Sequence, residues 1–125
     1  MIISGLSTGV NDMARNMSFF YTQEQIRNKT KTVTRRLGWN FLKPGDILNA
    51  CVKCQGLKKG EKIEKICQIR VRQIYRQWLW QITNDDVIKE GFPDMTTYQF
   101  VKMYRERMGL SCGHATVNRI EFDYI

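Results

Sequence analysis

The residues of this sequence best suited to chemistry form one short run, Lys31-Thr32-Val33-Thr34-Arg35-Arg36. It places an amine, two hydroxyls and two guanidinium groups around a single apolar residue. A lysine amine without its proton can activate a neighbouring hydroxyl as a nucleophile, whereas arginine binds phosphate or carboxylate through a planar fork of donors. The run therefore predicts either a threonine nucleophile served by a lysine base, or a cationic contact with a nucleic-acid backbone.

The lysine and the second threonine of this run can meet only if the backbone turns between them. Side chains three residues apart on a regular strand face opposite sides, so Lys31 and Thr34 require a turn or bulge within residues 31–34. A turn is expected there, because Thr22 and Gln25 have the spacing of a capping box that opens a short helix through about Asn28. We expect the run to lead from that helix into a strand.

Composition and charge favour a globular protein with a polyanionic partner. The chain has 125 residues, 42% of them hydrophobic, which suits one domain with a real core. No apolar stretch has the length of a membrane span and the N-terminus does not resemble a signal peptide, so we expect a cytoplasmic protein with no membrane partner. The sequence leaves the oligomeric state open, and a monomer is favoured. Lysine and arginine number 20 against 12 acidic residues, a net charge of +8 that favours RNA or another polyanion.

Short extended segments dominate the rest of the chain. We expect a loose N-terminal arm over residues 1–16 and a single domain over residues 17–125. Turn and cap signals predict strands at residues 17–21, 47–55, 63–75 and 116–125, and helices that begin at Thr83 and at Thr96 or Thr97 and end near Gly91 and Gly109. This order predicts an α+β fold, a small closed or partly open β-barrel with two or three short helices packed at its ends.

The long segment 63–75 carries a second candidate site. Apolar and polar residues alternate along it, which is typical of a half-buried strand with one wet face. Arginines on that face predict a basic stripe for RNA, and nearby aromatic rings could stack on unpaired bases. The alternative is a solvated strand face with barrel-plugging tryptophans. The candidate residues are Arg70, Arg72, Arg76, Tyr75, Trp78 and Trp80.

Metal chemistry is not favoured by the pattern. Cys51 and Cys54 have the spacing of a metal knuckle, and Cys112 and His114 could add two ligands. On a strand, however, an offset of three points the first two thiols to opposite faces. We therefore expect no metal and no cofactor. Carboxylates at metal-ligand spacing are also missing from the sequence, so a metal-dependent ribonuclease ranks behind the two functions above.

Several of these motifs together resemble the ASCH domain, a family related to the PUA-like RNA-binding barrels. The resemblance runs from about residue 17 to the C-terminus and is carried by the run 31–36, by the turn Leu42-Lys43-Pro44-Gly45-Asp46, by the acidic helix that leads to Glu90-Gly91-Phe92, and by Arg119-Ile120-Glu121-Phe122. It implies a PUA-like barrel with a cleft bearing the lysine–threonine motif. Similar acidic-helix signatures occur in phage and prophage relatives, which suggests such an origin.

The same resemblance implies two kinds of activity. Some members hydrolyse the amide of N4-acetylcytidine with a lysine, a threonine and a glutamate, whose counterparts here are Lys31, Thr34 and Glu90. Other members are described as RNA-binding or ribonucleolytic, and here Arg35 and Arg36 would contact the nucleoside or RNA. The second arginine of the run and the longer N-terminal arm depart from the amidohydrolase pattern. Both an amidohydrolase and a binding module without chemistry therefore remain open.

Overall fold

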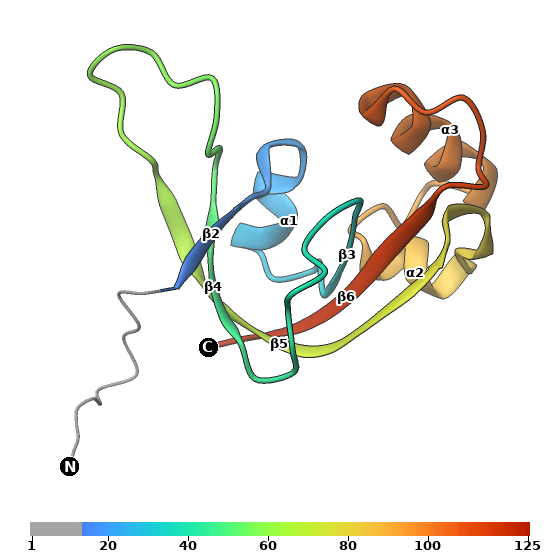
Figure 1. Cartoon of the computed structure of the whole chain (residues 1–125), viewed down its shortest axis with the longest axis horizontal. Helices are drawn as coiled ribbons and strands as arrows, with labels where there is room; N and C mark the ends of the chain where they lie inside the picture. Colours follow the sequence, from blue (N-terminus) through green and yellow to red (C-terminus); the bar gives the residue numbers. More distant parts are fainter. Residues whose placement is uncertain (1–13) are drawn as a thin grey trace.

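The computed structural model describes residues 14–125, which form one curled five-stranded sheet with three short α-helices (Figure 1). The sheet order is β2-β4-β5-β6-β3; β2 runs parallel to β4, and the other neighbouring strands are antiparallel. The strands are β2 (Arg15–Ser18), β3 (Val33–Arg36), β4 (Ile47–Cys51), β5 (Lys65–Trp78) and β6 (Thr116–Tyr124). The helices are α1 (Gln23–Arg27), α2 (Asn84–Lys89) and α3 (Thr97–Met108), with 3-10 turns η1 (Phe20–Thr22) and η2 (Leu79–Gln81).

Two clusters of buried apolar side chains hold the helices to the sheet. The first joins the curled sheet to α1 through Ile26, with Phe19, Ile120 and Phe122 among its members. The second lies where α2 and α3 gather beside η2 and the neighbouring end of β6, as Figure 1 shows, and it includes Phe100. Each large side chain buried in this way contributes about 1.5–3 kcal/mol. The first cluster therefore holds α1 in place on the sheet, and the second holds α2 and α3.

Two of the three predicted helix starts are confirmed by their capping bonds. The Thr83 hydroxyl accepts from the Asp86 N–H at 3.2 Å, and the Thr96 hydroxyl accepts from the Gln99 N–H at 3.1 Å. The prediction that Thr22 caps α1 through its side chain was wrong. The 3-10 turn η1 runs directly into that helix, so Thr22 is buried and makes no capping bond through its hydroxyl.

A β-bulge at Arg72 divides the expected basic stripe. Val71 and Gln73 of β5 pair with successive residues of β6, which leaves Arg72 as the extra residue. Before the bulge Arg70 lies opposite Asp123, and after it Arg76 lies opposite Asn118. Those two partners are five positions apart on β6 and face opposite sides of the sheet. The expected row of three arginines on one face was therefore wrong.

The N-terminal strand begins earlier and ends earlier than the sequence indicated. It starts at Arg15, so Arg15 and Asn16 belong to the sheet, and it ends at Ser18 because residues 20–22 form η1. Residues 1–13 of the expected arm lie outside the described residues, and the division into arm and domain stays a prediction. None of the helices within residues 14–125 is long and apolar enough to cross a membrane.

Candidate functional site

A cavity of about 880 Å³ opens between β3, the β2–η1 segment and α3. Lys31, Thr34 and Glu90 all line it, together with Arg35 and Arg36. Glu90 is 59 positions from Lys31 in the sequence, so the fold alone brings the carboxylate to the run. An amine, a hydroxyl and a carboxylate thus line one open cavity, whose volume is within the range of about 300–1,000 Å³ typical of small-molecule sites.

The turn after α1 lets Lys31 and Thr34 share this cavity. The strand β3 begins only at Val33. Lys31 precedes it, just after the turn at Asn28 and Lys29, and its backbone N–H donates to the Gln25 carbonyl at 3.2 Å. Thr32 then fixes the backbone, since its N–H donates to the Lys89 carbonyl at 2.8 Å. The opposite-face restriction of a regular strand therefore does not apply to Lys31 and Thr34.

Lys31 and Glu90 form a buried ion pair at the base of the cavity. The Lys31 Nζ donates to Glu90 Oε1 at 2.6 Å and to the Glu90 carbonyl at 2.8 Å, and both side chains are less than 5% exposed. Burial lowers the pKa of the Lys31 ammonium, and the Glu90 carboxylate opposes that shift. An amine whose pKa is lowered in this way loses its proton more readily than an exposed lysine.

Glu90 is positioned by the end of α2 and by the glycine that follows it. Gly91 has φ of +102°, and a Cβ built there would lie 2.7 Å from Gln25 Cγ. The Gln25 Nε2 donates to the Gly91 carbonyl at 3.2 Å. The α1 helix thus packs directly against the backbone beside Glu90, and the missing side chain at position 91 is what permits this approach.

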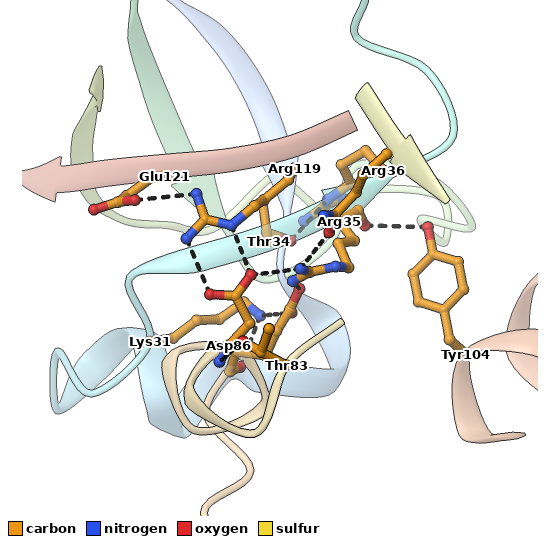
Figure 2. Close-up of polar contacts among 11 residues, drawn as sticks. Lys31, Thr34, Arg35, Arg36, Thr83, Asp86, Tyr104, Arg119 and Glu121 are labelled. Atoms are coloured by element: carbon orange, nitrogen blue, oxygen red, sulfur yellow. Dashed lines mark hydrogen bonds and ion pairs between the residues drawn. The ribbon is translucent and has the colours of Figure 1, made fainter. Parts of the chain in front are cut away.

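A second carboxylate, Asp86, joins the site to the sheet. Figure 2 shows Asp86 between Arg35 and Arg119, which are direct partners on β3 and β6. Arg35 NH2 donates to Asp86 at 2.5 Å, and Arg119 donates to both its oxygens at 2.6 and 3.0 Å. Arg35 also donates to Glu90 Oε2 at 3.1 Å. Opposed like charges destabilise a strand pair, and Asp86 offsets that repulsion as the one carboxylate bonded to both arginines, while Glu121 also pairs with Arg119.

The same network controls the ionisation of its members. Burial alone would raise the pKa of Asp86, but hydrogen bonds from Arg119 and Arg35 outweigh it and lower that pKa to about 2. The bond with Asp86 in turn raises the pKa of Arg119. The Tyr104 hydroxyl donates to the Arg35 carbonyl at 3.2 Å, and burial raises its pKa to about 12. Asp86 is therefore ionised and Tyr104 protonated at neutral pH.

Thr34 is bound by the second arginine of the run. Its Oγ1 accepts from Arg36 Nε at 3.2 Å, while Arg36 NH2 donates to the Ser18 carbonyl at 2.7 Å. The guanidinium also lies 4.9 Å from the centre of the Phe19 ring. Within residues 14–125 no hydrogen bond joins Thr34 to Lys31. Arg36 thus leaves the hydroxyl proton of Thr34 available to another acceptor.

The other residues predicted for binding do not line the cavity. Arg72 forms ion pairs with Glu121 and Asp123, and Arg70 is exposed on the sheet. Tyr75 lies beneath the Arg119 guanidinium, and Trp78 packs its ring edge-on against His114. The structure therefore separates the predicted site residues into two groups, because no residue of the bulged strand β5 lines the cavity.

Sequence reasoning missed Asp86, Arg119 and Tyr104. Asp86 could have been found, since it precedes Glu90 by four residues and so lies on the same face of α2.

The cysteines considered as metal ligands lie in different environments. Cys51 is buried and Cys112 is exposed. Among the described residues no group of three or more histidine, cysteine, aspartate or glutamate side chains is placed to hold a metal ion.

Comparison with known proteins identifies the fold. No family model matches the sequence, and none of the curated proteins compared with it matches. An ASCH domain from Lactobacillus crispatus JV V101 superimposes with a TM-score of 0.62 at 13% identity, covering 89% of this chain and 79% of that one. The chain has the fold of an ASCH domain. The expected α+β class, a PUA-like barrel with short helices at its ends, is confirmed in its partly open form.

Two further solved structures superimpose on this chain. The protein EF3133 from Enterococcus faecalis V583, of the family DUF984, has a TM-score of 0.63 at 11% identity over 93% of this chain and 78% of that one. The hypothetical protein PH0355 has a TM-score of 0.57 at 20% identity over 90% of this chain and 97% of that one. Identities this low establish a shared architecture and leave activity to be argued from the cavity itself.

Proposed function

We propose that the cavity binds a cytidine-type nucleoside and hydrolyses the amide of an acyl group on its N4 nitrogen. The observation that carries the proposal is the meeting of Lys31, Thr34 and Glu90 on one cavity, with Lys31 bonded to Glu90 at 2.6 Å. These are the three groups that the resemblance to amidohydrolase members of the ASCH family implies. The shared fold adds support without specifying the substrate.

The chemistry assigns one role to each group. The Thr34 oxygen attacks the acyl carbon, and the neutral amine of Lys31 takes the hydroxyl proton. The bond between the acyl carbon and N4 then breaks. The proton held by Lys31 passes through Glu90 to N4, the leaving amine of cytidine. Water hydrolyses the acyl-threonine, which releases a carboxylic acid and restores the hydroxyl. Each proton removed from a nucleophile is thereby returned to a leaving group.

Two contacts support these roles. Arg36 Nε donates to Thr34 Oγ1, so it stabilises the negative charge that forms when the hydroxyl loses its proton. Arg35 donates to Glu90 Oε2 and leaves Oε1 facing Lys31. Burial lowers the pKa of Lys31, which favours the neutral amine that the mechanism requires. The departure from the amidohydrolase pattern at Arg36 is compatible with this scheme.

The test compares cytidine release from N4-acetylcytidine by the full chain and by three variants. Thr34→Val removes the nucleophile at nearly constant volume, and we expect a loss of at least about 10²-fold in kcat. Thr34→Ser should restore part of the rate. Thr32→Val is the matched control, since its side chain does not line the cavity. Equal rates for Thr34→Val and Thr32→Val would refute the proposal.

A second candidate is a nucleoside- or RNA-binding site without chemistry. The observation that favours it is the ion pair itself, because a Lys31 ammonium bonded to Glu90 holds the proton that the hydrolytic role requires it to release. Under this function the full chain binds N4-acetylcytidine but forms no cytidine. Isothermal titration with N4-acetylcytidine, run beside the hydrolysis assay, separates the two functions. A metal-dependent ribonuclease would instead cleave RNA, and a chelator would abolish that cleavage.

A further inference from the structure

The mouth of the cavity is lined by exposed aromatic rings. Of the twelve large hydrophobic side chains exposed within residues 14–125, five line this one cavity. Tyr21 and Phe41 are 58% and 54% exposed. Large apolar groups gathered at one opening usually mark a binding surface, whereas scattered ones need no explanation. The five are Phe20, Tyr21, Leu37, Phe41 and Met108.

An arginine from a different element stacks on each of two of these rings. The Arg107 guanidinium of α3 lies 4.0 Å from the centre of the Tyr21 ring, and that of Arg15 in β2 lies 4.5 Å from the centre of the Phe41 ring. Within the described residues neither arginine forms an ion pair with a carboxylate. Each pair thus joins a flat apolar ring to an unneutralised cation.

The charges around the cavity are also one-sided. Its lining includes five cationic side chains and one carboxylate, Glu90, which is already bonded to Lys31 and Arg35. A free nucleoside carries no charge and uses none of the cations at the mouth. A strand of RNA supplies a phosphate beside every base, so it suits a cavity in which two rings are each paired with a guanidinium group.

We propose that the ring–arginine pairs Tyr21–Arg107 and Phe41–Arg15 bind the nucleotides that flank a target base in single-stranded RNA. This inference rests on the proposed function in taking the ligand of the cavity to be a nucleoside. One base enters the cavity, its neighbours stack on the rings, and the arginines contact the adjoining phosphates. The substrate class is then a modified base within a polynucleotide.

The experiment measures binding in the Thr34→Val background, so that no ligand is consumed. A single-stranded RNA of about eight nucleotides, within the usual range of site sizes, carries N4-acetylcytidine at its centre and a fluorescent label. Fluorescence anisotropy compares the background protein with Arg107→Gln and Tyr21→Leu. Lys102→Gln and Tyr98→Leu are the matched controls, since both residues are exposed on the same helix α3 and neither lines the cavity.

Five results are expected. The RNA binds more tightly than free N4-acetylcytidine, and a duplex of the same sequence binds less tightly because its bases cannot stack on the rings. Tyr21→Leu weakens RNA binding by at least about fivefold. Arg107→Gln lowers the slope of log affinity against log salt by about one between about 50 and 200 mM. The two control variants bind as the background protein does.

RNA that binds no more tightly than the nucleoside would overturn the inference, as would Arg107→Gln and Tyr21→Leu binding like their controls. Self-association that depends on Tyr21, with RNA binding unchanged, would identify a second copy of the chain as the occupant and overturn it as well. Hydrolysis is read separately in the protein with Thr34 intact. If that protein forms no cytidine while RNA binding depends on the rings, the proposed hydrolysis fails and this inference stands.

Discussion

Replacing Asp86 with asparagine tests whether one carboxylate holds the site together. At neutral pH the variant removes the one carboxylate that Arg35 and Arg119 share across β3 and β6, and leaves Arg35 with Glu90 and Arg119 with Glu121 as their remaining partners. The pKa of Asp86 falls from 3.8 to about 2 on folding, which corresponds to about 2 kcal/mol of stability. Removing one partner from a buried ion pair costs about 3–5 kcal/mol. We therefore expect Asp86→Asn to lower the free energy of unfolding by about 2–5 kcal/mol.

The pH dependence of this loss has a fixed direction. Because folding lowers the pKa of Asp86, the stabilisation is complete above the ordinary pKa of 3.8 and disappears as the pH falls towards 2. The difference in the free energy of unfolding between the parent protein and Asp86→Asn should thus decrease by about 2 kcal/mol across that interval. Urea unfolding followed by circular dichroism, repeated from pH 7 to pH 2, measures both quantities.

Asp85→Asn provides the control for this experiment. Asp85 is its exposed neighbour in the first turn of α2 and joins no ion pair within residues 14–125, so its replacement should change stability by no more than about 0.5 kcal/mol. A loss below about 1 kcal/mol for Asp86→Asn at pH 7 would refute the reasoning. So would a difference between the two proteins that stays constant as the pH falls.

Three further predictions concern the cavity and its supports. Gly91→Ala should lose about 1–3 kcal/mol in urea unfolding, because the new Cβ would meet Gln25 and the residue would keep a positive φ; a neutral result would show that α1 can move away. The rate of N4-acetylcytidine hydrolysis should rise with pH and level off below pH 10.5, the ordinary pKa of lysine. The reason is that burial lowers the pKa of Lys31 and only its neutral amine is a base. A rate that still rises above pH 10.5 would contradict this role of Lys31. Arg36→Gln should lower kcat more than it raises KM, since it removes the donor to Thr34 Oγ1; steady-state kinetics with an unchanged kcat would exclude that role.

The parts of the site that sequence reasoning reached are those set by local rules. Caps at Thr83 and Thr96 depend on residues three apart, so they could be read directly. The need for a turn between Lys31 and Thr34 followed from strand geometry, and the strand indeed begins after Lys31. Glu90 was reached through the family resemblance rather than through spacing, because nothing in the sequence links it to a lysine 59 positions away.

The parts that sequence reasoning missed depend on the sheet as a whole. The bulge at Arg72 reverses the faces that follow it, and strict alternation cannot anticipate an inserted residue. The role of Asp86 arises only when β3 pairs with β6 and sets Arg35 against Arg119. The ring–arginine pair of Tyr21 and Arg107 joins η1 to α3, two elements that no local pattern connects.

The opposed guanidinium groups of Arg35 in β3 and Arg119 in β6 also have a consequence for how this protein folds. Because Asp86 of α2 bonds to both arginines, we expect the pairing of the edge strand β3 with β6 and the docking of α2 to form together as one cooperative event. Amide protons of Thr34 and Val87 should consequently exchange with solvent at matched free energies of opening. We therefore expect the pocket to form and to be lost in a single step, with no unfolding intermediate that keeps only part of it.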